Sequence, residues 1–254
     1  ELRPLLFRLD QQNRQIQKQL EDLKNAESAR KEFTANVSHE LKTPLMSISG
    51  YAELMMNGMV PPDKMQDFSG RIFHESERLS NLVADIIQLS RLDEKNGETM
   101  FEQVDIGELG EDVINNLQNR AAKKKINLEY TGGPAQMQGV RHVLYEMFYN
   151  ITDNAIRYTP DGGDVKVFVG KLNGKPYFRV EDNGIGIPES EQQRIFERFY
   201  RVDKSHSRET GGTGLGLSIV KHGAVLHHAK ILLDSEPGKG TKMEILFDQT
   251  IAIP

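Results

Sequence analysis

One histidine of this 254-residue chain stands where it could act as a nucleophile. Glu40 follows His39 directly, and its carboxylate can accept a proton from one ring nitrogen while the other nitrogen attacks an electrophile. Thr43 lies one helical turn further on, where a hydroxyl could position water for the reverse, hydrolytic reaction. Pro44 has no N–H for the carbonyl of Glu40, so we expect the helix to bend and leave the imidazole exposed. A surface histidine beside an incidental proline kink is the simpler alternative.

Two glycine clusters have the composition of loops that bind phosphate. The first, residues 182–187, follows an alternating strand pattern, and the second, residues 211–217, leads directly into a helical pattern. Glycines let backbone N–H groups approach a phosphate closely, and the amino end of a helix favours negative charge. A single Gly-x-Gly pair usually marks a plain turn, and the chain has no Walker-type loop. The polar stretch that follows the aromatic segment 195–201 predicts a mobile lid between the clusters.

A helical pattern over residues 140–158 carries four side chains suited to a nucleotide. Asn150 and Asn154 lie one turn apart on one face, and their amide oxygens are hard ligands suited to Mg²⁺. They add no negative charge next to phosphates. Arg157 and Tyr158 continue the helix and offer a cation for phosphate and an aromatic surface for a base. The alternative is that both asparagines are ordinary amides of a helix surface.

The first 27 residues have the spacing of a coiled coil, with a solvated amphipathic helix as the alternative. The seam positions that repeat every seven residues are Leu2, Leu9, Ile16 and Leu23, with Asn13 in the complementary position. An asparagine in such a seam favours a two-stranded register, because its amide needs a partner across the interface.

Two long helical patterns follow the coil. The first runs to about residue 56 and the second from residue 63 to about residue 92, with turn residues at 57–62 between them. Each helix has an apolar stripe too wide for one partner. Two copies of this hairpin would bury the stripes as a four-helix bundle, so the pattern predicts a homodimer.

After residue 96 the pattern changes to that of an α/β layer domain. We expect helices over 106–124, with Asp105 as the cap, and over 140–158 and 218–226. The expected strands are 126–130, 165–169, 177–181, 231–233 and 242–247, with the Asn173-Gly174 turn joining the second and third. The chain therefore divides into 1–27, 28–95 and 96–254.

Composition excludes several classes. The absence of cysteine excludes disulfides and thiolate metal sites, and a net charge of −5 gives no reason to expect a nucleic-acid partner. The basic run Lys123–Lys125 is interpreted as a solvated helix end. No apolar run reaches the ~18 residues that span a bilayer, so membrane contact is expected only through segments outside this sequence.

Six motifs in this order resemble the sensor histidine kinases of two-component systems, over about residues 28–247. Residues 38–45 resemble the H box of that family, 146–159 the N box and 182–187 the first glycine box. Residues 195–201 resemble the F box, 212–217 the second glycine box and 236–241 the final glycine-rich box. Within the family, the chain resembles the phosphate-regulon type of sensor kinase from Gram-positive bacteria.

The resemblance implies a dimerisation hairpin followed by an ATP-binding α/β sandwich of the Bergerat type. It implies ATP-dependent phosphorylation of His39, with Glu40 as base, and transfer to an aspartate of a response regulator. Thr43 would assist a reverse phosphatase activity. The implied cofactors are ATP and Mg²⁺. The implied partners are a second copy of the chain and a response regulator. The implied location is the cytoplasmic part of a membrane-anchored sensor.

The resemblance also implies which residues contact the nucleotide. It implies Asn154 and Asn150 as the Mg²⁺ ligands. Asp182 would bind the adenine amino group and Tyr158 the ring, while Arg157 and Arg201 would face the phosphates. The implied set is Asn150, Asn154, Arg157, Tyr158, Asp182, Gly184, Gly186, Ile187, Arg201, Gly212, Thr213, Gly214, Leu215, Gly216, Leu217 and Thr241.

Three positions depart from the family pattern. Val140 stands where an aspartate usually precedes the N-box helix, so we expect a lost cap. His228-Ala229 replaces a common Gly-Gly turn, and Gly223 lies inside a helix at a cost of ~1 kcal/mol relative to alanine. Three other functions remain open: a nucleotide-binding dimeric scaffold, a form in which phosphatase activity dominates, and a gyrase- or chaperone-like ATPase.

Overall fold

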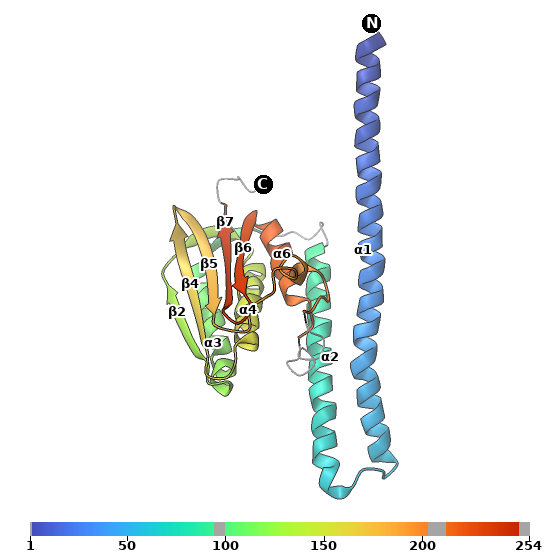
Figure 1. The fold of residues 1–254 in the computed structure, drawn as a ribbon, viewed down its shortest axis with the longest axis vertical. Helices are drawn as coiled ribbons and strands as arrows, with labels where there is room; N and C mark the ends of the chain where they lie inside the picture. The colour runs from blue at the N-terminus through green and yellow to red at the C-terminus, as the bar shows by residue number, and fades with distance from the viewer. Residues whose placement is uncertain (1, 94–99, 203–211, 249–254) are drawn as a thin grey trace. The chain divides into compact units, whose positions relative to one another are not determined.

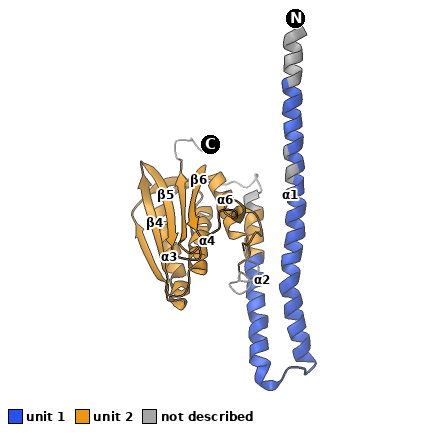
Figure 2. Ribbon diagram, in the orientation of Figure 1, with its two compact units in different colours: residues 1–82 blue, residues 83–254 orange. Residues whose placement is uncertain are grey.

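The computed structural model describes residues 2–93, 100–202 and 212–248 (Figure 1). The expected break at residues 96–97 and the lid stretch from 203 to 211 lie outside these ranges. The chain divides into two compact units, residues 1–82 and 83–254 (Figure 2). No helix in the described part is long and apolar enough to cross a membrane.

The first unit is a helical hairpin. Helix α1, Leu2–Met56, runs without a break through Pro44. A short 3₁₀ helix, η1 at Pro62–Lys64, precedes helix α2 at Met65–Asp93, so the second long helix begins two residues later than the pattern predicts. Proline at the first position of η1 sets this start, because its ring suits the first turn of a helix. Tyr51 of α1 meets Phe68 of α2 edge to face, with ring centroids 5.5 Å apart.

Apolar side chains of this hairpin remain uncovered in the single chain. Ile16, Leu20 and Leu23 in the predicted coiled coil are 52%, 62% and 70% exposed. Nearer the turn the exposed set is Leu45, Met46, Leu54, Met56, Met59, Met65 and Phe73. Burying such residues is favourable, so long helices that leave them uncovered favour a helical partner.

The second unit is built on a five-stranded mixed sheet with the order β2-β4-β5-β7-β6 (Figure 1). The strands are β2 (Asn127–Gly132), β4 (Asp164–Leu172), β5 (Lys175–Asp182), β6 (Ala229–Glu236) and β7 (Gly240–Phe247). Strand β2 pairs with β4 in parallel, and the other neighbours pair antiparallel. Asn173 and Gly174 both have positive φ, 52° and 81°, which confirms the predicted two-residue hairpin between β4 and β5.

Three helices cover one face of this sheet, so the fold has the predicted α/β layers (Figure 1). They are α3 (Ile106–Lys123), α4 (Arg141–Tyr158) and α6 (Gly216–Leu226). Phe148 of α4 stacks on Phe178 of β5, with centroids 3.9 Å apart and rings 2° from parallel. Both side chains are fully buried, so this pair joins the helical layer to the centre of the sheet.

The sequence analysis missed two short strands, β1 (Glu102–Asp105) and β3 (Gln136–Gly139), which form a separate antiparallel pair. Asp105, predicted as the cap of α3, also holds this pair. Its Oδ1 accepts N–H bonds from Gly107 at 2.9 Å and Ala135 at 3.0 Å, and its Oδ2 accepts from Gln136 Nε2 at 2.8 Å. These bonds, that of Ala135 foremost, lower the pKa of the Asp105 carboxyl.

Helix α4 is supported at its start by a buried histidine. Val140 has no side-chain cap, as expected, but its N–H donates to Nε2 of His227 at 3.0 Å. The other ring nitrogen, Nδ1, lies 2.8 Å from the carbonyl oxygen of Gly223 and so carries the proton. Burial lowers the pKa of His227 to about 4, which keeps the ring neutral.

The end of α4 is capped by a lysine. Lys124 Nζ donates to the carbonyl oxygens of Ile156 and Arg157 at 2.9 Å each and also to that of Thr159. The solvated-helix-end interpretation of the basic run was therefore wrong for Lys124, because its ammonium satisfies carbonyls that the helix leaves unpaired.

The other two departures also have a physical reason. His228 has φ +51°, the left-handed conformation that glycine usually supplies at this turn. At Gly223 a Cβ would lie 2.6 Å from Met147 Cγ and 3.1 Å from Val143 Cγ1. The glycine thus allows α6 to pack closely against α4.

Candidate functional site

His39 lies on α1 with an exposed side chain, as predicted, and Glu40 next to it is half-buried. The hydroxyl of Thr43 donates to the carbonyl oxygen of His39 at 3.2 Å. Pro44 is buried. A nucleophilic imidazole, a carboxylate and a hydroxyl therefore lie within about one turn of one helix, open to a reacting partner on the histidine side.

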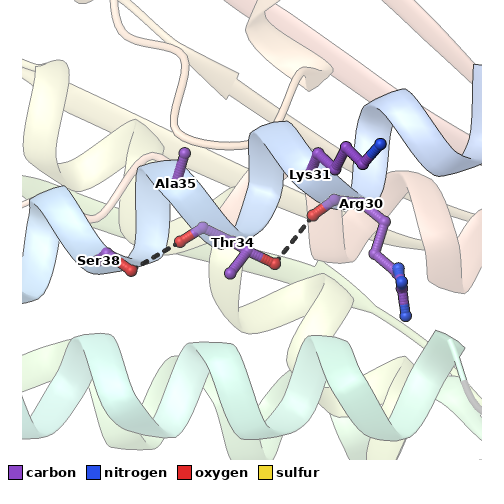
Figure 3. A pocket seen from close by; sticks show the side chains of 5 residues that line it. All are labelled: Arg30, Lys31, Thr34, Ala35 and Ser38. Carbon is purple, nitrogen blue, oxygen red and sulfur yellow. Dashed lines mark hydrogen bonds between the residues drawn. The ribbon is translucent and has the colours of Figure 1, made fainter.

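A shallow hollow lies on α1 before His39 (Figure 3). Its lining residues are Arg30, Lys31, Thr34, Ala35 and Ser38. The Ser38 hydroxyl donates to the carbonyl of Thr34 at 2.9 Å, and the Thr34 hydroxyl donates to that of Arg30 at 3.0 Å, as the dashed lines in Figure 3 show. All five residues are exposed and belong to one helix, which cannot enclose a ligand by itself.

On α4 the carboxylate of Asp153 holds two arginines. Asp153 is buried at 7% exposure, with Arg120 Nη1 2.6 Å from Oδ1 and Arg157 Nη2 3.1 Å from Oδ2. Nε and Nη1 of Arg157 are buried and have no hydrogen-bond partner among the described residues. Buried N–H groups without partners are costly, so this guanidinium is suited to an anionic ligand such as phosphate.

Arg157 lies against the second glycine cluster. A Cβ on Gly212 would stand 2.8 Å from Arg157 Nη1 and 4.0 Å from the Tyr158 hydroxyl. The absence of a side chain at Gly212 therefore keeps space between the cluster, the cation and the ring. Tyr158 is 38% exposed at the last position of α4.

Asn150 faces the start of α6. Its Nδ2 donates to the carbonyl of Glu146 at 2.9 Å, which fixes the amide and directs Oδ1 away from its own helix. A Cβ on Gly216 would lie 2.6 Å from that oxygen. Asn154 is half-buried one turn later. Among the described residues no group of three His, Cys, Asp or Glu side chains could hold a metal, so the fit to Mg²⁺ rests on the amide oxygens.

Asp182 has one carboxylate oxygen engaged by backbone. Oδ1 accepts from the N–H of Gly184 at 2.9 Å and from that of Thr241 at 3.2 Å. Burial raises the pKa of this carboxyl. Because both backbone donors reach Oδ1, Oδ2 can accept a hydrogen bond from an amino group of a ligand.

The first glycine box, residues 182–187, is a tightly packed turn. Gly186 has φ +68°, and a Cβ there would overlap the backbone of Glu236. At Gly184 a Cβ would lie 2.6 Å from the carbonyl oxygen of Tyr158. The N–H of Ile187 donates to Ser235 Oγ at 2.8 Å. Glycine is therefore required where this turn meets α4 and β6.

The second glycine box packs on a residue with unusual backbone geometry. Phe199 has φ +63°, and its N–H donates to the carbonyl of Gly214 at 2.9 Å. A Cβ on Gly214 would lie 2.8 Å from the Phe199 backbone. Leu215 is fully buried, and Leu217 packs against the core. Arg201 is half-buried, and residues 203–211, which precede Gly212, lie outside the described ranges.

Sequence reasoning missed Asp85, which lies in the part of α2 that belongs to the second unit. Its Oδ2 accepts from the hydroxyl of Thr213 at 2.6 Å, and burial raises its pKa. Glu146 also has a pKa raised by burial, and Gln88 is hydrogen-bonded to it. The only signal for Asp85 was an acidic residue inside the apolar stretch 82–89.

The structure thus gathers the predicted residues in three places. Arg157, Tyr158 and Gly212 meet at the end of α4, Asn150 meets Gly216, and Asp182 joins Gly184 to Thr241. His39, Glu40 and Thr43 lie on α1 in the other unit.

Two family models match the chain. Residues 29–95 match the His Kinase A (phospho-acceptor) domain, and residues 139–251 match the histidine kinase-, DNA gyrase B- and HSP90-like ATPase. The chain belongs to the sensor histidine kinase family. The gyrase- or chaperone-like alternative is excluded, because those ATPases do not need the segment around His39 that the phospho-acceptor model matches.

Individual relatives agree with this. The sensor-like histidine kinase SenX3 of Mycolicibacterium smegmatis is 38% identical over 230 residues, which are 90% of this chain and 58% of SenX3. The phosphate regulon sensor protein PhoR of Pseudomonas aeruginosa is 35% identical over 85% of this chain and 49% of PhoR. The chain therefore spans about half the length of these relatives.

A solved structure supports the fold. Histidine kinase ThkA, in complex with the response regulator protein TrrA, aligns with a TM-score of 0.68 and 22% identity over 86% of this chain and 61% of that one. At this identity the likeness establishes the arrangement of the fold alone.

Proposed function

We propose that this chain uses ATP to phosphorylate His39 and passes the phosphoryl group to an aspartate of a response regulator. The observation that carries the proposal is made at Arg157, whose buried Nε and Nη1 have no hydrogen-bond partner among the described residues and which lies beside Gly212. A phosphate would satisfy both groups at a glycine loop that leads into a helix. The same chain carries an exposed histidine followed by a carboxylate.

The adenine end of the nucleotide is assigned to Asp182 and Tyr158. Asp182 Oδ2 would accept from the amino group of the base, while Gly184 and Thr241 hold Oδ1. Tyr158, partly exposed, offers its ring to the base. Gly186, Ile187, Thr213, Gly214, Leu215 and Leu217 shape the loops around the nucleotide.

Asn150 and Asn154 would hold Mg²⁺ through their Oδ1 atoms, with Arg157 and Arg201 facing the phosphates. The ion supplies charge neutralisation to the phosphate chain when bound. The Glu146 carbonyl fixes the Asn150 amide, so its oxygen is already turned outward before a ligand arrives.

In the transfer, one imidazole nitrogen of His39 attacks the γ-phosphorus of ATP. The N–P bond forms while the bond from phosphorus to the bridging oxygen breaks, and ADP leaves. Glu40 accepts the proton from the other ring nitrogen, which keeps the phosphorylated ring neutral apart from its phosphoryl group. Positioning of the reacting groups by the protein supplies most of the rate enhancement.

The working form that we propose is a homodimer. The uncovered apolar residues of the hairpin and the 52–70% exposure of Ile16, Leu20 and Leu23 support a four-helix bundle extended by a coiled coil. The limits 1–27, 28–95 and 96–254 for coil, phosphotransfer and catalytic domains remain a prediction, as does placement in the cytoplasm behind a membrane anchor.

A second activity, removal of the phosphoryl group, is proposed through Thr43. Its side chain lies one turn after His39 on the same helix, where its hydroxyl could direct water to a phosphorylated partner. Loss of label from a phosphorylated regulator should slow in Thr43→Ala and Thr43→Val. Equal rates in these variants and the wild type would exclude this role.

The kinase proposal is tested with ATP labelled in the γ-phosphate and Mg²⁺. We expect protein-bound label that acid removes and base does not. ATP binding without label in the wild type would instead support the scaffold or phosphatase-dominant alternatives.

A further inference from the structure

An arginine of α2 contacts the carboxylate that follows His39. Arg78 Nη2 lies 3.8 Å from Glu40 Oε2, and Arg78 Nη1 lies 3.6 Å from Oε2 of Glu75, one turn earlier on α2. One guanidinium thus lies between two carboxylates from two helices, with a different nitrogen facing each.

The three side chains are shielded from water far more than an ordinary surface pair. Their exposed fractions are 16% for Arg78, 28% for Glu40 and 29% for Glu75. Arg71 and Asp67, an ion pair on the same helix, are 54% and 53% exposed. Because shielding strengthens electrostatic attraction, the Arg78 cluster constrains its members where the Arg71 pair does not.

Glu75 has a further role in the cluster. Its Oε2 is buried and has no hydrogen-bond partner within the part of the chain that the structure describes, so the nearby guanidinium charge compensates it. Glu75 therefore holds Arg78 in place, and Arg78 can present its second nitrogen to Glu40.

We infer that Arg78 is a positioning residue for the phosphorylation of His39: held by Glu75, it fixes the Glu40 carboxylate that takes the imidazole proton. This inference rests on the proposed function. A carboxylate with one oxygen next to a guanidinium has fewer accessible positions, and misplacement of a catalytic group by ~1 Å can cost about 100-fold in rate.

The test measures initial rates of autophosphorylation of the full chain over a range of ATP concentrations. In Arg78→Gln we expect the rate at saturating ATP to fall about tenfold, while the half-saturating ATP concentration stays within about twofold. Arg78→Lys should recover part of the rate, since lysine keeps the positive charge but lacks the two separate N–H groups of the guanidinium that face Glu40 and Glu75. Arg71→Gln is the matched control and should match the wild type.

A double variant separates positioning from a general structural effect. In a Glu40→Gln background, Arg78→Gln should cause no further loss, because the group that it positions is already gone. The inference is overturned if Arg78→Gln keeps more than half of the wild-type rate, or if it slows Glu40→Gln by the same factor as the wild type. If Arg78→Gln does not fold, Arg78→Lys carries the same comparison.

The labelling experiment distinguishes failure of the proposed function from failure of the role of Arg78. An unlabelled wild-type protein would contradict the proposed function itself. A labelled wild type with a fully active Arg78→Gln would contradict only the role of Arg78.

Discussion

The two units place polar groups in opposite surroundings. In the hairpin, His39 is exposed on a long helix, and the Arg78 cluster is held at 3.6–3.8 Å. In the α/β unit, Asp153 is 7% exposed and binds Arg120 at 2.6 Å and Arg157 at 3.1 Å, and the Arg157 side chain is 12% exposed whereas that of Arg120 is 42% exposed. The proposed phospho-acceptor His39 is therefore exposed, whereas the proposed nucleotide residue Arg157 is held by a buried carboxylate.

Substitutions in the two units should therefore differ in their effect on stability. Surface changes away from buried features alter stability little, whereas loss of one partner of a buried charge costs several kcal/mol. Changes at the acceptor side should therefore affect chemistry with little effect on folding. Changes to Asp153, Arg120 or Arg157 should affect both the chemistry and the folding.

The largest expected effect is on activity. Asn154→Ala should lower autophosphorylation by about 100-fold or more, because it removes a proposed Mg²⁺ ligand and its charge neutralisation. The thermal midpoint should change little, since Asn154 is half-buried and alanine favours the helix. If Asn154→Ala is labelled at more than a tenth of the wild-type level, Asn154 is not a ligand of Mg²⁺.

The second largest effect is expected on stability, at the ion pairs of Asp153 with Arg120 and Arg157. Asp153→Ala should lower the free energy of unfolding by about 3 kcal/mol, because two arginines lose their shared carboxylate. The matched control is Asp112→Ala, whose partner Arg141 lies 3.3 Å away in a pair that is 44% and 49% exposed. That change should cost at most about 0.5 kcal/mol. Equal losses in urea unfolding would show that burial does not distinguish the two networks.

A smaller and pH-dependent effect is expected at His227. Above pH 6.5 the ring is neutral in both states and stability is complete. Between 6.5 and about 4 the unfolded chain binds a proton that the folded ring excludes, so stability falls, and below about 4 the loss levels off. Acidification from pH 7.5 to pH 5 crosses about 1.5 units of this interval and should cost about 2 kcal/mol.

The measurement is urea unfolding at pH 7.5 and pH 5 for the wild type and His227→Gln. Glutamine can accept from the Val140 N–H but cannot titrate, so the variant should lose less stability on acidification. His142 and His228, the titratable groups that act on the ring, are present in both proteins. Equal losses would mean that His227 contributes nothing to acid sensitivity.

The sequence predicted those parts of the fold that local patterns specify. The Asn173-Gly174 hairpin, the cap at Asp105 and helix α4 follow from residues close in the chain. The β1–β3 pair was missed because each strand has four residues and the pairing joins distant segments. His227 beneath Val140 was missed for the same reason, since 87 positions separate them.

The site shows the same division. Motif spacing predicts Arg157, Asp182 and the glycines as site residues, because the family pattern lies in contiguous residues, and this assignment stays a prediction. The contacts of Asp85 with Thr213 and of Arg120 with Asp153 depend on how helices pack, and no spacing in the sequence encodes them. Contacts between polar side chains that are distant in sequence are thus the part of a site that sequence patterns reveal least.

Phosphorylation of His39 is tested most directly by measuring ATP affinity and protein-bound label on the same sample of His39→Gln. We expect wild-type ATP affinity, because the proposed nucleotide residues lie in the other unit, and no acid-labile label. Acid-labile label on His39→Gln would contradict the assignment of the acceptor, and a lost affinity for ATP would contradict the separation of acceptor and nucleotide sites.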